Sequence, residues 1–75
     1  MDISLDRLCL GQKGIVTHIN TENAMKNRLR IFGMVPGTLV CCRYQTPGGS
    51  VTALEFRGTV VALRTRDLKK IRVEC

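Results

Sequence analysis

The cysteines and the single histidine are the side chains of this chain that could hold a metal ion or form a disulfide. The four cysteines stand at positions 9, 41, 42 and 75 with no C-x-x-C pair among them, and only His18 could add a nitrogen ligand. Neighbouring residues on a strand point to opposite faces, so Cys41 and Cys42 are poorly placed to coordinate the same ion. The spacing therefore predicts no metal site. Cys42 is expected to be a buried small apolar side chain, the other thiols exposed or half-exposed, and Cys75 part of a frayed tail.

Catalytic chemistry has few candidate groups in this chain. One histidine and six scattered carboxylates provide no Ser-His-acid set, and Asp2 and Asp6 are expected to be solvated charges near a short helix start. Gly48 and Gly49 could cradle a phosphate only if a helix and a P-loop lysine came after them, so a hairpin turn is the better interpretation. His18 is expected to be a surface or rim residue. The sequence thus predicts neither an enzyme nor a bound cofactor.

The chain is small and strongly basic. Its 75 residues predict a single domain over 1–75, and its net charge of +6, with eight arginines among twelve basic residues, favours an anionic partner: nucleic acid, acidic lipid or an acidic protein face. The longest apolar run, residues 60–63, is too short to span a bilayer, and the N-terminus lacks the basic and apolar regions of a signal peptide. We therefore expect a cytoplasmic protein whose thiols are reduced.

The segment from Arg28 to Gly37 predicts the junction that positions the other elements. Gly33 can adopt the left-handed conformation that ends a helix, and Met34 comes next, where a hydrophobic contact back onto the helix is expected. Pro36 presets the first corner of a turn, and Gly37 supplies the positive φ that a type II turn needs at its second corner. The chain is therefore expected to reverse from a helix into a strand within a few residues.

A helix of about ten residues is expected before this junction. Asn20 or Thr21 is its predicted N-cap, and Glu22 lies in the predicted first turn, where the helix dipole favours a carboxylate. Its core face is predicted from apolar residues at spacing i, i+4, i+7, namely Met25, Leu29 and Phe32. Before this helix, a short helical turn is expected after Ser4, a turn over 11–14 and a strand over 15–20.

Beyond the junction, glycine corners separate short strands. Residues 38–46 are expected to form a strand in which Val40, Cys42 and Tyr44 share one face, and residues 47–50 a turn. The return strand over 51–57 points Leu54 and Phe56 inward. Gly58 breaks or bulges it before a strand over 59–65, a short helical turn over 66–70 and a closing strand over 71–73. Several short strands with one inserted helix predict a mostly β fold, a small closed or partly open barrel.

Two patterns point to function, and the first is that of a nucleic-acid-binding barrel. The run Gly11-x-x-Gly14-x-Val16-x-x-Ile19 resembles the glycine-containing strand motif of KOW-type domains in RNA-binding and transcription proteins. Barrels that bind single strands usually offer several exposed aromatic rings, whereas this chain has one tyrosine, two phenylalanines expected in the core, and no tryptophan. A basic KOW-like barrel that binds RNA or DNA is therefore the alternative interpretation.

The second pattern runs through nearly the whole chain. It comprises Ser4-Leu5-x-x-Leu8-x-x-Gly11-x-x-Gly14-x-Val16-x-x-Ile19, Arg28-Leu29-x-x-x-Gly33-Met34-x-Pro36-Gly37, Ala62-Leu63-Arg64 and Ile71-x-Val73. The order of these motifs resembles the FeoA family, small cytosolic proteins encoded with FeoB, the bacterial membrane transporter for ferrous iron. The resemblance implies an SH3-like barrel with one inserted α-helix. It also implies a non-enzymatic accessory that contacts FeoB, peripheral to the inner membrane through that partner and not inserted into it.

The candidate contact surface lies near the helix–turn junction and on the strands. Lys26 and Arg30 are expected on the outward side of the helix, and Val35 is a candidate apolar anchor at the turn. Arg57 and Arg64 are expected to face solvent on the strands and to extend the basic patch. The complete set of predicted partner-binding residues is Lys26, Arg30, Met34, Val35, Arg57 and Arg64. With so few ligands available, the domain itself is not expected to hold iron.

Overall fold

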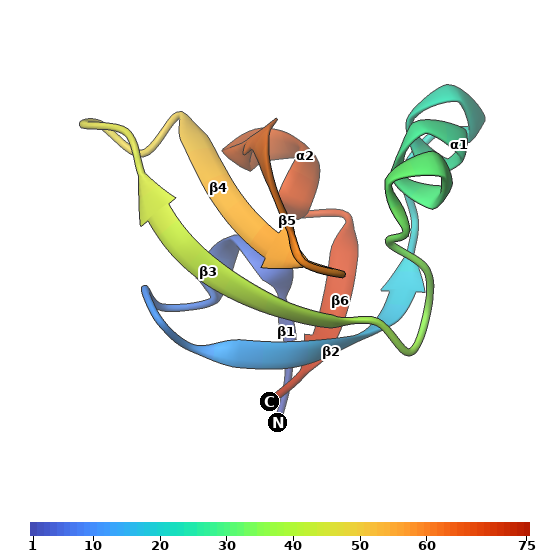
Figure 1. Cartoon of the computed structure of the whole chain (residues 1–75), viewed down its shortest axis with the longest axis horizontal. Coiled ribbons are helices and arrows are strands. Elements are labelled where there is room, and N and C mark those ends of the chain that lie inside the picture. Colours follow the sequence, from blue (N-terminus) through green and yellow to red (C-terminus); the bar gives the residue numbers. More distant parts are fainter.

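The computed structural model describes all 75 residues, which form one antiparallel sheet curled into a small barrel (Figure 1). The elements are, in chain order, β1 (Asp2–Ser4), the 3₁₀ turn η1 (Leu5–Arg7), β2 (Lys13–Ile19), α1 (Asn23–Phe32), β3 (Leu39–Gln45), β4 (Val51–Phe56), β5 (Thr59–Arg64), α2 (Thr65–Leu68) and β6 (Ile71–Glu74). The strand order is β1-β6-β2-β3-β4-β5. This is the mostly β fold with one inserted helix and short helical turns that the sequence predicts. Neither helix has the length and apolar character needed to cross a bilayer.

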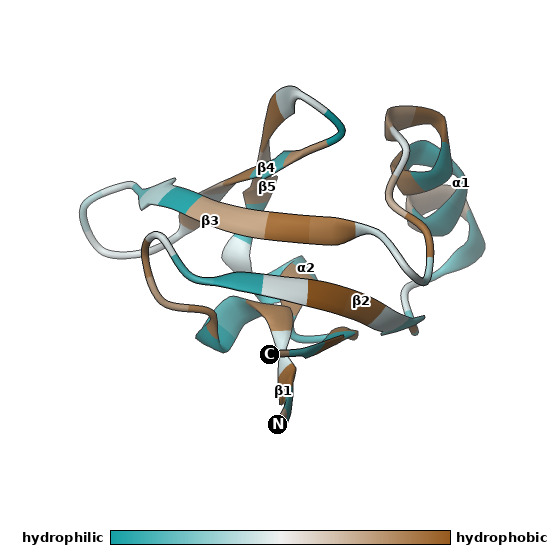
Figure 2. Ribbon diagram, turned by 60° about the horizontal axis from the view of Figure 1, so that its bottom comes forward, coloured by the Kyte–Doolittle hydropathy of each residue, from teal (hydrophilic) through white to brown (hydrophobic).

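The core fills the inside of the curled sheet. Alternate side chains are buried in β6 and in the first half of β2, and Figure 2 shows the apolar stretches of β2 and β3 lying next to each other. Fourteen buried apolar residues form one cluster: Leu5, Leu8, Val16, Ile19, Leu29, Met34, Val40, Cys42, Leu54, Phe56, Leu63, Leu68, Ile71 and Val73. Every helix and every strand except β1 contributes to this cluster, so one core holds the whole chain together.

The two termini lie side by side (Figure 1). The amino group of Met1 donates to Glu74 Oε1 at 2.6 Å and to the carbonyl oxygen of Cys75 at 2.7 Å. The backbone N–H of Cys75 donates to the Met1 carbonyl oxygen at 3.0 Å. The prediction that Cys75 belongs to a frayed tail is therefore wrong, because the pairing of β1 with β6 continues to the last residue. The hydrogen bond to Glu74 is the main cause that raises the pKa of the terminal amino group.

Helix α1 has the expected ten residues but differs from the prediction at both ends. Its N-cap is Glu22, which makes no side-chain capping bond, and Thr21 Oγ1 is buried without a hydrogen-bond partner. The predicted cap at Asn20 or Thr21 is therefore wrong, and Glu22 precedes the first turn. Phe32 is 44% exposed rather than part of the core. The helix ends directly after it and the chain turns back, so the buried position that Phe32 was expected to fill is taken by Met34.

A bulge in β3 overturns the expected alternation of its side chains. Cys42 pairs with Leu54 and Tyr44 with Ala53, so β3 carries one extra residue between two adjacent residues of β4. Because an extra residue shifts the later residues of a strand to the other face, Tyr44 is 55% exposed while Val40 and Cys42 are buried. Cys41 is also buried, contrary to the expectation of an exposed or half-exposed thiol.

The two hairpins around β4 are built from residues with positive φ. Gly48 and Gly49 have φ of 86° and 76° in the turn between β3 and β4, which confirms the predicted hairpin. Between β4 and β5, Arg57 and Gly58 have φ of 54° and 75°, and Phe56 pairs with Thr59. This is a two-residue hairpin turn. It is the break expected at Gly58, and it ends β4 one residue earlier than predicted.

Candidate functional site

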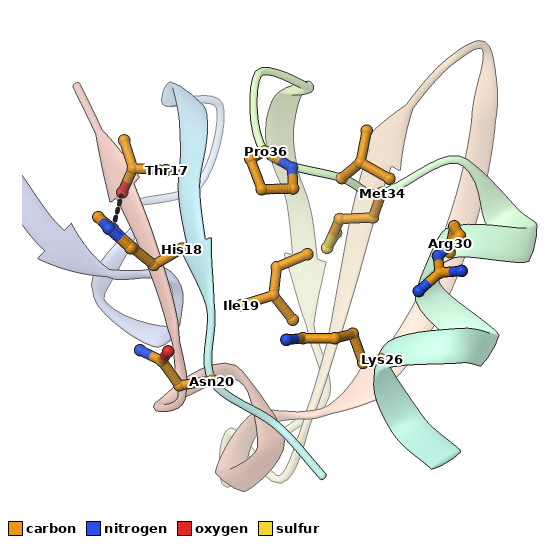
Figure 3. Close-up of a pocket in the computed structure, with 9 residues that line it drawn as sticks. Thr17, His18, Ile19, Asn20, Lys26, Arg30, Met34 and Pro36 are labelled. Atoms are coloured by element: carbon orange, nitrogen blue, oxygen red, sulfur yellow. Dashed lines mark hydrogen bonds between the residues drawn. The ribbon is translucent and has the colours of Figure 1, made fainter. Parts of the chain in front are cut away.

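A cleft opens where the end of β2 faces α1 and the turn after that helix (Figure 3). We call it the α1 cleft. Its volume is about 340 Å³, and its nine lining residues are Thr17, His18, Ile19, Asn20, Lys26, Arg30, Met34, Val35 and Pro36. Four of the six residues predicted to bind a partner lie here, namely Lys26, Arg30, Met34 and Val35. All four come from α1 or from the turn that follows it.

The turn after α1 brings Met34 under the cleft. Gly33 has φ of 98°, its N–H donates to the Arg30 carbonyl oxygen at 3.0 Å, and the Met34 N–H donates to the Leu29 carbonyl oxygen at 2.8 Å. These two bonds define a Schellman motif, which also expects an apolar contact between the residues at the positions of Met34 and Leu29. Both side chains are buried, and Met34 has no exposed surface at all. Met34 therefore supports the cleft from beneath and offers no surface for direct contact with a partner.

Thr38 holds this turn in place, a role that the sequence analysis missed. Its hydroxyl donates to the Gly33 carbonyl oxygen at 3.1 Å and accepts from the Val35 N–H at 3.1 Å. Two further backbone bonds tie the turn to β2, from Gly37 N–H to the Val16 carbonyl oxygen at 2.7 Å and from Val16 N–H to the Thr38 carbonyl oxygen at 2.9 Å. Because these bonds hold the turn from both sides, the half-buried Val35 is presented from a fixed backbone.

The helical side of the cleft carries two positive charges. Lys26 and Arg30 are four residues apart, so they share one face of α1, and Figure 3 shows both side chains extending toward the space between α1 and β2. Both are exposed. The three ion pairs of the structure join Met1 to Glu74, Arg43 to Glu55 and Arg72 to Asp2, so neither cation of the cleft is neutralised. No carboxylate lines the cleft.

The opposite side of the cleft comes from β2 and is polar above an apolar base. Ile19 is buried, whereas His18 and Asn20 are exposed at the rim, as expected for His18. The Nδ1 atom of His18 lies 3.3 Å from Thr17 Oγ1. The cleft thus combines an apolar floor from Ile19 and Met34 with hydrogen-bonding groups on one side and cations on the other. This combination suits a peptide segment that carries an apolar side chain beside an acidic one.

The remaining predicted site residues, Arg57 and Arg64, lie elsewhere. The side chain of Arg57 passes over the end of α1: a Cβ atom placed on Gly33 would lie 3.2 Å from Arg57 Cδ. Arg57 therefore covers the last helical turn instead of lining the α1 cleft. Arg64 ends β5 and lines a separate hollow beside α2. The structure thus divides the single basic surface expected from the sequence into separate regions.

No metal-binding cluster accompanies the cleft. The structure contains no group of three or more histidine, cysteine, aspartate or glutamate side chains placed to hold an ion. All four cysteines are free. Burial raises the pKa of the Cys42 thiol, with the neighbouring Cys41 adding to the shift. The buried thiol is therefore held protonated, which makes it a poor nucleophile and a poor ligand.

The chain is similar to FeoA proteins in sequence and in structure. A family model described as the FeoA domain matches residues 3–75. The solution structure of the FeoA protein from Chlorobium tepidum has a TM-score of 0.92 at 25% identity, covering 96% of this chain and 69% of that one. The FeoA-like protein from Clostridium acetobutylicum has a TM-score of 0.85 at 30% identity, with 97% and 85% covered. No curated protein matches the chain.

A third similar structure carries a description of fold and role. It is the crystal structure of Stenotrophomonas maltophilia FeoA complexed with zinc, with a TM-score of 0.79 at 28% identity, covering 99% of this chain and 89% of that one. That protein is described as a prokaryotic SH3 domain and is suggested to be a bacterial ferrous iron transport activating factor. The expected SH3-like barrel is thereby confirmed for the fold described above.

Proposed function

The chain belongs to the FeoA family, and from that premise we propose that it is a non-enzymatic accessory of bacterial ferrous iron uptake that binds the membrane GTPase transporter FeoB through the α1 cleft. The observation that carries this proposal is the composition of the cleft. An apolar floor with two unneutralised cations at its edge is a surface for a protein segment. The role suggested for the Stenotrophomonas relative supports an action on iron transport. Such a protein works at the cytosolic face of the inner membrane, held there by its partner.

The rigidity of the turn supports recognition rather than chemistry. Binding by a surface that is already ordered avoids the entropy cost of fixing loops on association. The turn that carries Val35 is held by the Schellman motif and by Thr38, so the cleft exists before a partner arrives. None of the groups around the cleft forms an acid–base pair or an activated nucleophile, and the proposal therefore includes no catalytic step.

The nucleic-acid alternative is weakened by where the aromatic rings lie. Phe32 and Tyr44 are both exposed, so two rings are available for base stacking. Phe32 ends α1 and Tyr44 lies near the end of β3, and these two places are on opposite sides of the molecule (Figure 1). A single strand is bound by neighbouring rings along one groove. The arrangement therefore favours a protein partner.

Uptake of ferrous iron in cells tests the proposal. The double substitution Lys26→Glu with Arg30→Glu reverses the charge at the cleft and leaves the core untouched. We expect this variant to be folded and soluble but unable to support iron uptake in a strain that lacks the wild-type protein. The matched control is Arg7→Glu with Lys13→Glu, which reverses the same charge at exposed sites outside the cleft and should retain uptake. Full uptake with the cleft variant would refute the assignment.

A further inference from the structure

A second hollow, separate from the α1 cleft, lies where the start of β4, the end of β5 and α2 meet. We call it the basic hollow. Its volume is about 460 Å³, and it is lined by Gly49, Ser50, Val51, Arg64, Thr65, Arg66 and Lys69. Val51 is the only hydrophobic residue among them. The basic hollow therefore lacks the apolar floor that the α1 cleft has.

Three cations line this hollow without a counter-charge. Arg64, Arg66 and Lys69 are exposed, and none of them takes part in the three ion pairs of the structure. No carboxylate lines the hollow itself. Glu22 and Asp67 line the two adjoining clefts, both of which Arg66 borders and one of which Arg64 borders. Like charges that share one concave surface repel each other and raise the local concentration of anions. The hollow is therefore electrostatically complementary to a small, highly charged anion.

The backbone under the hollow is fixed by hydrogen bonds from several elements. Val51 pairs with Arg64 across β4 and β5, and the Thr65 N–H donates to the Ser50 carbonyl oxygen at 3.0 Å. Nearby, Thr65 Oγ1 lies 2.8 Å from Thr52 Oγ1. The cations thus extend from a framework whose parts come from distant points of the chain but keep one relative position.

We propose that the basic hollow binds a phosphate group. A guanidinium offers two parallel N–H donors that match two phosphate oxygens, and an ammonium adds a compact charge. Arg64 and Arg66 supply guanidinium groups, and Lys69 supplies the ammonium group. Ser50, whose hydroxyl is a further hydrogen-bonding group, also lines the hollow. The phosphate comes either from the head group of an anionic phospholipid or from a soluble phosphate compound. This site is distinct from the α1 cleft and goes beyond the function proposed above, since it involves no contact with FeoB.

Titration with inorganic phosphate tests the site directly. We expect saturable shifts of the backbone amide resonances of Ser50, Arg64, Thr65 and Lys69 in two-dimensional NMR spectra, absent with chloride at equal ionic strength. The variant Arg64→Gln with Lys69→Gln should weaken binding by about tenfold or more, because it removes two of the three charged donors. The matched control, Lys26→Gln with Arg30→Gln, removes the same net charge from the α1 cleft and should bind phosphate within about twofold of wild type. Equal losses in both variants would show that net charge alone is responsible and would overturn the site.

Vesicle binding separates the two sources of phosphate. Sedimentation with phosphatidylcholine vesicles, with and without phosphatidylglycerol, measures attraction to lipid head groups. Binding that requires phosphatidylglycerol, is lost in Arg64→Gln with Lys69→Gln and is competed by phosphate supports a membrane head group. Shifts with free phosphate but no vesicle binding support a soluble compound. The proposal is overturned if neither probe perturbs the hollow, or if single-stranded RNA binds these residues more tightly than either probe.

Discussion

The α1 cleft and the basic hollow are both positively charged, but different kinds of residue lie beneath their charges. Lys26 and Arg30 stand over Ile19 and Met34, which belong to the core cluster, whereas Arg64, Arg66 and Lys69 stand over a polar turn with Val51 alone as apolar support. The two positively charged surfaces therefore differ in the residues that lie beneath the charges. The residues beneath the charges decide the partner: an apolar floor adds affinity for a side chain, and its absence leaves attraction for a small anion.

Truncating the apolar side chain beneath each surface should change the free energy of unfolding by very different amounts. This is the largest effect that we expect. Met34→Ala deletes a fully buried side chain and should lower the free energy of unfolding by about 2–5 kcal/mol, measured by urea titration. Val51→Ala, under the basic hollow, removes a half-buried side chain and should cost about 1 kcal/mol or less. Equal costs would show that the cleft is not built on the core. Met34→Leu keeps the volume and serves as the conservative control.

The helix stop that positions the cleft should contribute a second, smaller effect. Gly33→Ala forces a side chain into φ of 98° and brings its Cβ against Arg57, and it should cost about 1–2 kcal/mol in thermal or urea unfolding. Gly37→Ala faces almost the same φ, 97°, with nothing within 4 Å of the new Cβ, and so isolates the backbone strain. We expect Gly33→Ala to exceed Gly37→Ala, and Arg57→Ala to reduce the difference. A Gly33→Ala variant as stable as wild type would contradict the role of the junction.

Neither region should depend on a metal ion, which gives the smallest expected effect. His18 is the one potential nitrogen ligand at the α1 cleft, and the basic hollow has no cysteine, histidine or carboxylate in its lining. A strong chelator should therefore change the melting temperature of the reduced protein by about 1 °C or less, since no metal contributes to folding. Loss of structure with the chelator, or stoichiometric zinc or iron that survives gel filtration, would contradict this expectation.

Local sequence signals predicted the helix–turn junction better than they predicted which strand and helix-end side chains are exposed. The helix stop at Gly33 and the turn at Gly37 depend on residues within a few positions, and both have the expected positive φ. Phe32 is exposed because the helix ends directly after it, and the chain that turns back buries Met34 instead. The exposure of Tyr44 depends on the bulge that forms where β3 pairs with β4. Neither of these determinants is visible in the local pattern.

The same distinction explains which site residues were brought together. Lys26 and Arg30 share a face because helical spacing requires it, and Val35 lies within the same junction. The positions of Arg57 and Arg64 depend on the order of strands in the sheet, so no local pattern could separate them. Arg66 and Lys69 were missed, although the spacing Arg64-x-Arg66-x-x-Lys69 next to a predicted helical turn was a usable signal.

Direct binding to FeoB is the measurement that tests the central claim about the α1 cleft. Full-length FeoB in nanodiscs would be titrated with the wild-type protein, with Lys26→Glu and Arg30→Glu combined, and with the control Arg7→Glu and Lys13→Glu. We expect the cleft variant to bind about tenfold or more weakly, a loss of about 1.4 kcal/mol or more, and the control to bind like wild type with moderate salt dependence. Equal affinity of the cleft variant and the wild type, or binding that falls log-linearly and steeply with salt whichever variant is used, would contradict the account.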